Sequence, residues 1–545
     1  MLIQRLHPDD DAIVALRNLR AGDTAALDGR TWTLRSDVAA KHKFAACDFA
    51  AGDLVKMYGT IAGRTLCAVA AGELLSRENV THATASPVAR ATDFRWQPPD
   101  VSRWRWRTFD GFRRADGRCG TANHWLVVPM VFCENRNIEV MREALTKGLG
   151  YAVTTPYSDF VSGLADAWRA GGSLDDAKLQ KSPAASRVFP NVDGVKFLQH
   201  SLGCGGTRQD ARALCGLLAG YITHPNVAGA TVLSLGCQNA EVEMLREEIE
   251  KRTNSKSDAK PLLVFEQQKS ASERDLLERA LRETFRGIAQ ANELRREPLP
   301  LSDIVLGLKC GGSDGFSGIS ANPALGHCSD LLAALGGTGV LCEFPELCGA
   351  EQWLCDRCGD TALAERFLDL MRRYNERAHA VGSGFDMNPS PGNIRDGLIT
   401  DAMKSLGAAR KGGGAPVLDV VDYPEPITMR GGLTLLCTPG NDVEATTALT
   451  GSGCNVIVFT TGLGTPTGNP ICPVVKMSTN TDLATRMADI IDFDAGPIVT
   501  GEKTIAAVGE ELLDHIIEVA SGRATPAAVR LGQDDFIPWK RGVSL

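Results

Sequence analysis

The chain has 545 residues, of which 43% are hydrophobic and 23% charged, a composition typical of a globular protein with more than one core. Its net charge of −8 is mild and no long basic run occurs, so we expect no nucleic-acid partner. Acidic residues appear early in the N-terminal segment, and no apolar run approaches the roughly 20 residues that span a bilayer, so we expect neither a secretory signal nor a membrane partner. Sixteen cysteines without an export signal indicate reduced thiols and a cytoplasmic location.

Residues 1–90 are expected to form a small β domain. Short apolar segments alternate with turns built from a small residue, a glycine and an acid, at residues 21–23, 51–53 and 71–73. This near-repeat is typical of a compact barrel-like fold. Residues 91–107 are polar, contain Pro98 and Pro99, and should form a linker whose tryptophans dock it on the next domain.

The remainder of the chain alternates apolar strand-like segments with helices. Strands are expected at residues 125–132, 230–235, 261–266, 304–308, 338–342, 416–421, 433–437 and 455–459, nearly all ending in polar loops. The clearest helix, residues 271–292, should begin with a capping box made by Ser270 and Glu273. This pattern predicts α/β layers with mostly parallel sheets, in two domains spanning residues 108–255 and 256–545. A ligand cleft should lie at the carboxyl ends of the strands.

The stretch from Asp303 to Pro323 carries the densest chemistry. A buried strand ends at Lys309 and Cys310, and a glycine-rich loop follows that can approach a ligand closely. We expect this loop to position substrate hydroxyls through Ser313, Asp314, Ser317 and Asn322. Glu343 and Glu346 follow the next strand and are alternative acid/base groups, although solvated acids at a helix start would look the same.

Cysteine spacing offers two metal sites. Cys204, Cys237 and Cys310 each lie on a glycine-flanked loop, and three thiolates would leave one position of an iron–sulfur cluster open to a substrate oxygen. The alternative is three small residues at tight turns. A structural zinc site is less favoured, because its C-x-x-C looks helical and has no second close pair; its ligands would be Cys342, Cys348, Cys355 and Cys358. The glycine run at residues 462–468 has the wrong spacing for a dinucleotide fingerprint.

Several longer motifs resemble the altronate/galactarate dehydratase family, lyases that remove water from hydroxylated carboxylates. They are FDGFRR (109–114), HSLGCG (200–205), LGCQN (235–239), LKCGGSDGFSGISANPALG (308–326), EFPELCGAE (343–351), MNPSPGN (387–393), TPGND (438–442) and FTTGLGT (459–465). The N-terminal unit resembles an SAF domain, a β-clip fold, with Lys41-His42-Lys43 matching its Gly-His-Lys motif. The chain departs from the family at Ser76-Arg77-Glu78-Asn79, where a His-x-His-Asn run is common, and at Ala122, where many members carry arginine.

The resemblance implies a hydro-lyase that depends on iron, either as Fe²⁺ or as a cluster on the three cysteines, with His42 a further candidate metal ligand in the SAF domain. A metal would help the poor hydroxide leaving group more than a general base alone can. The candidate bases are His200 and Lys309. Further substrate contacts are expected within the family motifs, from Asn388, Asn393 and Thr461.

The expected reaction converts an aldonate or aldarate, foremost D-altronate, to its 2-keto-3-deoxy acid through α-proton abstraction and iron-assisted loss of the 3-hydroxyl. Dehydration of galactarate or another sugar acid, and a sulfolactate-type elimination, are alternatives. A non-catalytic sugar-acid-binding protein is a further alternative, motivated by the departures at residues 76–79 and 122. The partner is a small-molecule sugar acid, and a homo-oligomer is possible.

Overall fold

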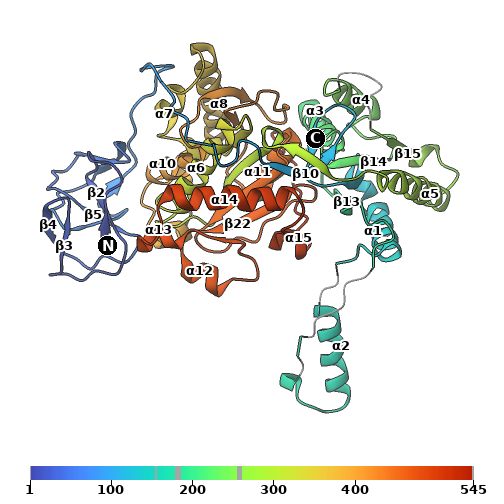
Figure 1. Ribbon diagram of the computed structural model, residues 1–545, viewed down its shortest axis with the longest axis horizontal. Coiled ribbons are helices and arrows are strands. Elements are labelled where there is room, and N and C mark those ends of the chain that lie inside the picture. The colour runs from blue at the N-terminus through green and yellow to red at the C-terminus, as the bar shows by residue number, and fades with distance from the viewer. Residues whose placement is uncertain (1, 154–155, 177, 180–185, 254–259, 543–545) are drawn as a thin grey trace.

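The computed structural model describes residues 2–153, 156–176, 178–179, 186–253 and 260–542. Figure 1 shows an N-terminal β domain at one end, a large central α/β domain, and a second α/β domain at the other end. The central domain is built from the C-terminal part of the chain. None of the helices described is both long and apolar enough to cross a membrane.

The N-terminal domain is made of short antiparallel strands. A four-stranded sheet has the order β1-β2-β5-β8, β3 pairs with β4, and a three-stranded sheet has the order β6-β7-β9. The bounds are β1 Ile3–Gln4, β2 Ala12–Ala15, β3 Thr24–Leu27, β4 Arg30–Thr33, β5 Lys43–Ala45, β6 Leu54–Met57, β7 Thr60–Thr65, β8 Leu74–Leu75 and β9 Val80–Thr81. Gly22, Gly52 and Gly72 of the repeated turns have φ of 89°, 93° and 84°, a conformation that favours glycine.

The segment after β9 crosses the surface of the central domain. The Val88 and Ala91 N–H groups donate to the side chains of Gln352 and Asp356 there. Trp104 is buried, and its indole N–H donates to an Asp514 oxygen at 2.8 Å. Trp106, by contrast, is 85% exposed, so it does not dock the segment.

The second domain has a four-stranded parallel sheet of order β13-β12-β14-β15. Its elements are β12 His124–Pro129, η1 Phe132–Glu134, α1 Asn135–Leu149, α2 Pro156–Arg169, η2 Leu174–Asp176, β13 Gly194–Phe197, α3 Arg208–Ile222, β14 Val227–Ser234, α4 Val242–Glu250, β15 Leu262–Glu266, η4 Gln267–Lys269 and α5 Glu273–Ala291. The predicted boundary at residues 255/256 is wrong, because β15 pairs with β14 and α5 packs on both. The residue capping α5 is Ser272, not Ser270, and its side chain accepts the Asp275 N–H.

Three short strands join the second and central domains. β10 Thr108–Arg113 pairs antiparallel with β11 Cys119–Gly120 and with β16 Glu297–Pro300. Because β16 follows α5, the chain leaves the second domain only after this helix.

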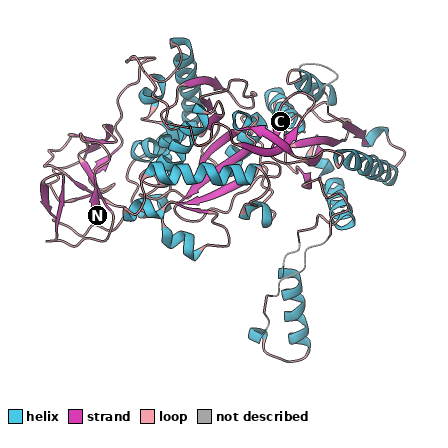
Figure 2. Cartoon of the chain, viewed as in Figure 1, coloured by secondary structure: helices cyan, strands magenta, loops and turns pink. Residues whose placement is uncertain are grey.

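The central domain contains a seven-stranded parallel sheet of order β19-β20-β18-β17-β21-β22-β23, covered by helices (Figure 2). The strands are β17 Val305–Cys310, β18 Thr338–Leu341, β19 Val417–Val421, β20 Leu433–Leu436, β21 Val456–Thr461, β22 Val474–Ser478 and β23 Phe493–Asp494. The helices are η5 Leu301–Asp303, α6 Ala321–Ala334, η6 Phe344–Leu347, α7 Glu351–Cys355, α8 Thr361–Ala380, η7 Phe385–Met387, α9 Pro391–Arg395, α10 Asp401–Ala409, η8 Arg410–Gly412, α11 Asp442–Ser452, α12 Thr481–Arg486, α13 Gly496–Thr500, α14 Ile505–Ala520 and α15 Ala527–Arg530. The predicted α/β class with a small N-terminal β domain is confirmed.

The β17 strand lies near the middle of this sheet and is buried on both faces, which accounts for its nearly continuous apolar sequence. Leu306 and Leu308 join the core that includes residues of α6 and α14, whereas Val305 joins the core shared with α3 and α11. Since β17 is held from both sides, its carboxyl end is a rigid base for functional groups.

The contact between α3 of the second domain and α11 of the central domain depends on a glycine. A Cβ built on Gly220 would lie 1.9 Å from the backbone oxygen of Gly451. We expect Gly220→Ala to lower the free energy of unfolding by about 1–3 kcal/mol, the usual cost of overpacking. Urea denaturation would measure this loss. Gly148→Ala in α1, where a Cβ meets nothing within 4 Å, is the matched control and should be neutral or slightly stabilising; equal behaviour of the two variants would contradict the prediction.

Candidate functional site

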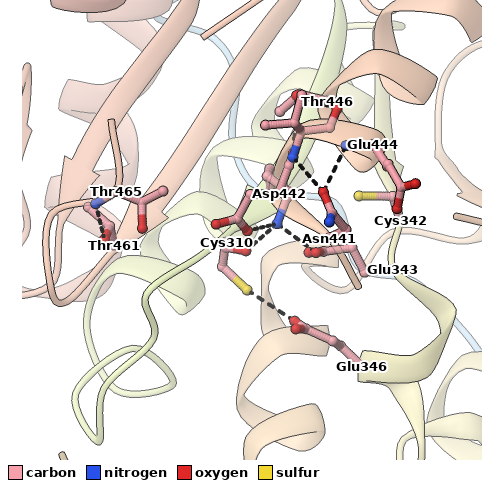
Figure 3. Close-up of polar contacts among 12 residues, drawn as sticks. Cys310, Cys342, Glu343, Glu346, Asn441, Asp442, Glu444, Thr446, Thr461 and Thr465 are labelled. Carbon is pink, nitrogen blue, oxygen red and sulfur yellow. Dashed lines mark hydrogen bonds and ion pairs between the residues drawn. The ribbon is translucent and has the colours of Figure 1, made fainter. Parts of the chain in front are cut away.

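Charged side chains gather where β17 and β18 end. Lys309 and Cys310 close β17, and Glu343 and Glu346 follow β18, all four being buried. Figure 3 shows Cys310 beside the two glutamates. Glu343 has a φ of 68°, which is uncommon for a residue with a side chain and is held here by a hydrogen bond from its N–H to the Thr438 hydroxyl. We call this set, completed by Asn388, Lys404, Lys411 and Asp442, the charged cluster.

Lys309 is a fixed cation. Its Nζ donates to Glu343 Oε1 at 2.6 Å, to Asp442 Oδ1 at 2.7 Å and to the Cys310 carbonyl at 2.5 Å. Burial opposes its charge, but the carboxylates of Glu343 and Asp442 outweigh burial and raise the Lys309 pKa well above its ordinary value. Because all three protons are engaged, Lys309 fits electrostatic stabilisation and not the base role that the sequence suggested.

Two further lysines hold the other acidic groups. Lys404 Nζ lies 2.7 Å from Glu346 Oε1 and 2.7 Å from the Asn388 side-chain oxygen. Lys411 Nζ lies 2.7 Å from Cys310 Sγ. The second oxygen of Glu346, Oε2, accepts no lysine proton from the described residues and lies 3.7 Å from the same sulfur.

The pKa values of the two glutamates are shifted in opposite directions. Burial, and then the charge of Glu346, raise the pKa of Glu343 to about 7. Burial also opposes ionisation of Glu346, but the ammonium groups of Lys404, Lys309 and Lys411 outweigh it and lower the Glu346 pKa. Glu343 Oε2 is buried without a hydrogen-bond partner among the described residues, whereas Oε1 is bound by Lys309. Glu343 can therefore carry a proton near neutral pH, while Glu346 stays ionised.

A small, partly open pocket lies between the N-terminal domain and the central domain and includes Lys404 of the charged cluster. Its lining residues are Lys43, Met57, Tyr58, Ser313, Asp314, Gly315, Ser317, Gly318, Asn322, Leu398, Met403, Lys404, Gly407 and Ala408. Four of the residues expected to contact substrate are among them: Ser313, Asp314, Ser317 and Asn322.

The expected polar residues of the glycine-rich loop are largely engaged within the protein. Asp314 binds Lys41 Nζ of the N-terminal domain at 3.0 Å and accepts the Ser317 hydroxyl at 3.0 Å. Asn322 accepts the Thr460 hydroxyl at 2.6 Å and donates to the Gly407 carbonyl. These contacts shape the wall of the pocket and attach the N-terminal domain to it.

Of the three residues expected from the later motifs, one belongs to the charged cluster and two hold neighbouring loops. Asn388 donates to Glu346 Oε1 at 3.2 Å and so belongs to the charged cluster. The Asn393 side chain donates to the Ser313 carbonyl at 2.7 Å, and the Thr461 hydroxyl accepts the N–H groups of Gly464 and Thr465 (Figure 3). Asn393 and Thr461 thus stabilise loops beside the cluster.

His200 lies in the second domain with both ring nitrogens engaged. One nitrogen is 2.8 Å from the Pro129 carbonyl and the other accepts the Leu202 N–H. Burial lowers the His200 pKa to about 4. This arrangement indicates a structural residue and not a general base. His42 of the N-terminal domain is placed against the Arg395 carbonyl, 3.2 Å from Nε2.

The described residues form two groups in which three or more histidine, cysteine or acidic side chains place ligand atoms within 4.8 Å of one another. One is Cys310 with Glu343 and Glu346; the other is His82 with Cys348 and Asp401. Neither includes Cys204 or Cys237, which are exposed in the second domain, so the three-cysteine set is not assembled here.

Within the charged cluster, Cys310 and Glu346 are the two residues placed to contact one metal ion. The 3.7 Å between Cys310 Sγ and Glu346 Oε2 is close to the roughly 3.6 Å expected for a sulfur and an oxygen bound to one tetrahedral divalent ion. Glu346 is kept ionised by its lysines. Burial raises the pKa of the Cys310 thiol, and Lys411 Nζ at 2.7 Å opposes this rise, so a metal held there would displace the thiol proton. Glu343, with its raised pKa, is better suited to carry a proton than to bind metal.

Three residues of the charged cluster were not expected from the sequence: Lys404, Lys411 and Asp442. Lys404 is an isolated lysine in the otherwise buried helix α10, and Lys411 precedes three glycines. An ammonium group within a run of small and apolar residues is the signal that could have identified both, because a buried lysine needs an acidic partner.

Three family models match this chain, and their ranges correspond to the three domains of the structure. The altronate/galactarate dehydratase SAF domain matches residues 1–83. The second domain of D-galactarate dehydratase/altronate hydrolase matches residues 111–292, and the D-galactarate/altronate dehydratase C-terminal domain matches residues 301–544.

Individual relatives are similar over nearly the whole chain. Altronate dehydratase of Escherichia coli (strain K12) is 34% identical over 528 residues, 96% of this chain and 95% of the relative. Altronate dehydratase of Bacillus subtilis (strain 168) is 33% identical, with 95% of each chain covered. Galactarate dehydratase (L-threo-forming) of Escherichia coli (strain K12) is 30% identical, covering 95% of this chain and 92% of the relative.

Proposed function

Because the chain belongs to the altronate and galactarate dehydratase family, we propose that it dehydrates a sugar acid, foremost D-altronate, to the 2-keto-3-deoxy acid. The identities of 34% and 33% to two altronate dehydratases, against 30% to a galactarate dehydratase, support this order of candidates. The observation that carries the proposal is the buried pair Glu343 and Glu346, whose pKa values are shifted in opposite directions.

The reaction needs a group that removes the proton on the carbon next to the carboxylate. Glu343 Oε2 is suited to this step, since it is buried, has no hydrogen-bond partner among the described residues, and belongs to a group that titrates near neutral pH. Negative charge then develops on the substrate carboxylate as the carbanion forms. Lys309, Lys404 and Lys411 are buried ammonium groups that can stabilise this charge without reorganising.

The C3–O bond then breaks, and the proton held on Glu343 Oε2 can pass to the departing hydroxyl, which leaves as water. The resulting enol ketonises to the 2-keto-3-deoxy acid. Cys310 and Glu346 are the residues that would hold iron, which would supply Lewis-acid assistance to the departing hydroxyl. Iron and acid-labile sulfide should be measured in anaerobically purified protein: iron without sulfide that is lost in Cys310→Ser supports this assignment, and iron with an equal amount of sulfide contradicts it.

A substrate panel tests the function. D-altronate, galactarate and sulfolactate would be incubated with the iron-loaded protein, and 2-keto acid and sulfite would be assayed. The highest kcat/KM is expected for D-altronate. A preference for galactarate would change the proposed substrate but keep the dehydration reaction. Sulfite release from sulfolactate would replace dehydration by a sulfo-lyase reaction. Tight sugar-acid binding without product would indicate a non-catalytic binding protein.

A further inference from the structure

A second group of metal-ligand side chains lies outside the charged cluster, where three segments distant in sequence meet. His82 directly follows β9 of the N-terminal domain, Cys348 directly follows η6, and Asp401 begins α10. Their ligand atoms all lie within 4.8 Å of one another. His82 Nδ1 is 2.6 Å from Asp401 Oδ1.

The packing shows that these segments are held together closely. A Cβ built on Gly349 would lie 3.0 Å from Thr84 Cγ2 and 3.3 Å from Ala402 Cβ, so the three segments pack tightly next to Cys348. The φ of 93° at this position also favours glycine. The Thr400 hydroxyl donates to the Ala62 carbonyl of the N-terminal domain at 2.7 Å. The juxtaposition is therefore built into the contact between the two domains.

Asp401 provides independent evidence for a ligand. Its side chain is 4% exposed, and its second oxygen, Oδ2, is buried without a hydrogen-bond partner among the described residues. An unsatisfied buried carboxylate oxygen is costly. In the charged cluster, three lysines face the acidic groups and balance their charge. Asp401 has no lysine beside it among the described ion pairs; its partner is His82.

We propose that His82, Cys348 and Asp401 bind a zinc ion that clamps the N-terminal domain to η6 and α10. One nitrogen, one sulfur and one oxygen donor match the ligands that zinc prefers, and exposure of the His82 side chain leaves room for water as the fourth ligand. On binding, His82 Nδ1 and Asp401 Oδ1 separate to about 3.3 Å as zinc replaces their hydrogen bond. Protons bound to the ligand atoms are released to solvent.

The zinc site lies close in sequence to two residues of the charged cluster, so zinc would help to position them. Cys348 is two residues after Glu346, and Asp401 is three residues before Lys404, and Glu346 and Lys404 pair with each other in the charged cluster. Zinc would thus anchor both segments that carry this pair. Zinc acts here as a positioning element, outside the reaction itself.

Zinc uptake by the full-length protein tests the site. Protein freed of metal with EDTA would be titrated with zinc, and bound zinc and the thermal midpoint measured for wild type, His82→Ala and Cys348→Ser. Both variants should bind one zinc fewer than wild type and show a smaller zinc-dependent rise of the midpoint. Cys67→Ser, which removes an exposed thiol of the N-terminal domain, is the matched control and should behave as wild type. Wild-type zinc uptake by either variant would overturn the proposal.

Cobalt distinguishes this site from the charged cluster, which also contains a thiol. Co²⁺ bound to a thiolate gives a charge-transfer absorption. We expect this absorption to persist in Cys310→Ser and to disappear in the Cys310→Ser/Cys348→Ser double variant. Its absence from Cys310→Ser, or its persistence in the double variant, would place the thiolate metal elsewhere and refute the site.

Discussion

Glu343→Gln is expected to lower kcat by about 10²–10⁴-fold while the protein remains folded. Glutamine has the same shape and can still accept the Lys309 proton that Glu343 Oε1 accepts at 2.6 Å. It cannot take up a proton from the substrate at the buried Oε2 position. Steady-state kinetics on D-altronate, with circular dichroism to verify folding, would measure the loss.

The pH dependence of the same pair of proteins provides a second readout. Burial and the charge of Glu346 raise the Glu343 pKa to about 7, so the carboxyl group becomes protonated, and inactive as a base, as the pH falls below that value. The wild-type kcat/KM should therefore decrease about tenfold per pH unit on the acid side, whereas the residual activity of Glu343→Gln should not show this limb. Glu444→Gln, a nearby acid at the start of α11, is the control and should keep the wild-type profile. Wild-type kcat in Glu343→Gln would reject Glu343 as the proton carrier.

The location of the charged cluster follows from a pattern that the sequence contains. An apolar strand ending in Lys309 and Cys310, and another followed by Glu343, meet at one edge of a parallel sheet because parallel strands end on the same side. Periodicity and glycine positions were sufficient to place both strand ends at this edge, whereas the contact between them depends on β17 and β18 being neighbours in the sheet.

The partners of these groups could not be found in the same way. Lys404 and Lys411 come from α10 and η8, and only tertiary packing brings them against Glu346 and Cys310. The expected metal site on three glycine-flanked cysteines is not assembled among the described residues for the same reason, because tertiary packing decides which loops meet. Cys204 and Cys237 share it with Cys310, but they follow strands of a different sheet, and a local pattern carries no information on distances between sheets.

Lys309→Met is expected to lower the free energy of unfolding by about 3–5 kcal/mol, as removal of one partner from a buried ion pair does. The methionine fills a similar volume, but Glu343 and Asp442 lose the ammonium group that both contact. Denaturant unfolding monitored by tryptophan fluorescence would measure the change. Lys503→Met removes a lysine whose ion pair with Glu511 is exposed on both sides, and this control should change stability by only about 0–1 kcal/mol.

The origin of this loss can be separated from loss of packing by changing the pH and the partner. In Lys309→Met the penalty comes from ionised carboxylates without a cation, so it should be smaller at pH 5 than at pH 8, because Glu343 is protonated at the lower pH. A loss caused by poor packing of the methionine would not depend on pH in this way. The double variant Lys309→Met/Glu343→Gln should likewise be more stable than the sum of the single losses predicts, since the glutamine removes one of the two unpaired charges. Strict additivity together with a pH-independent loss would show that Lys309 stabilises the fold by packing and not by its charge.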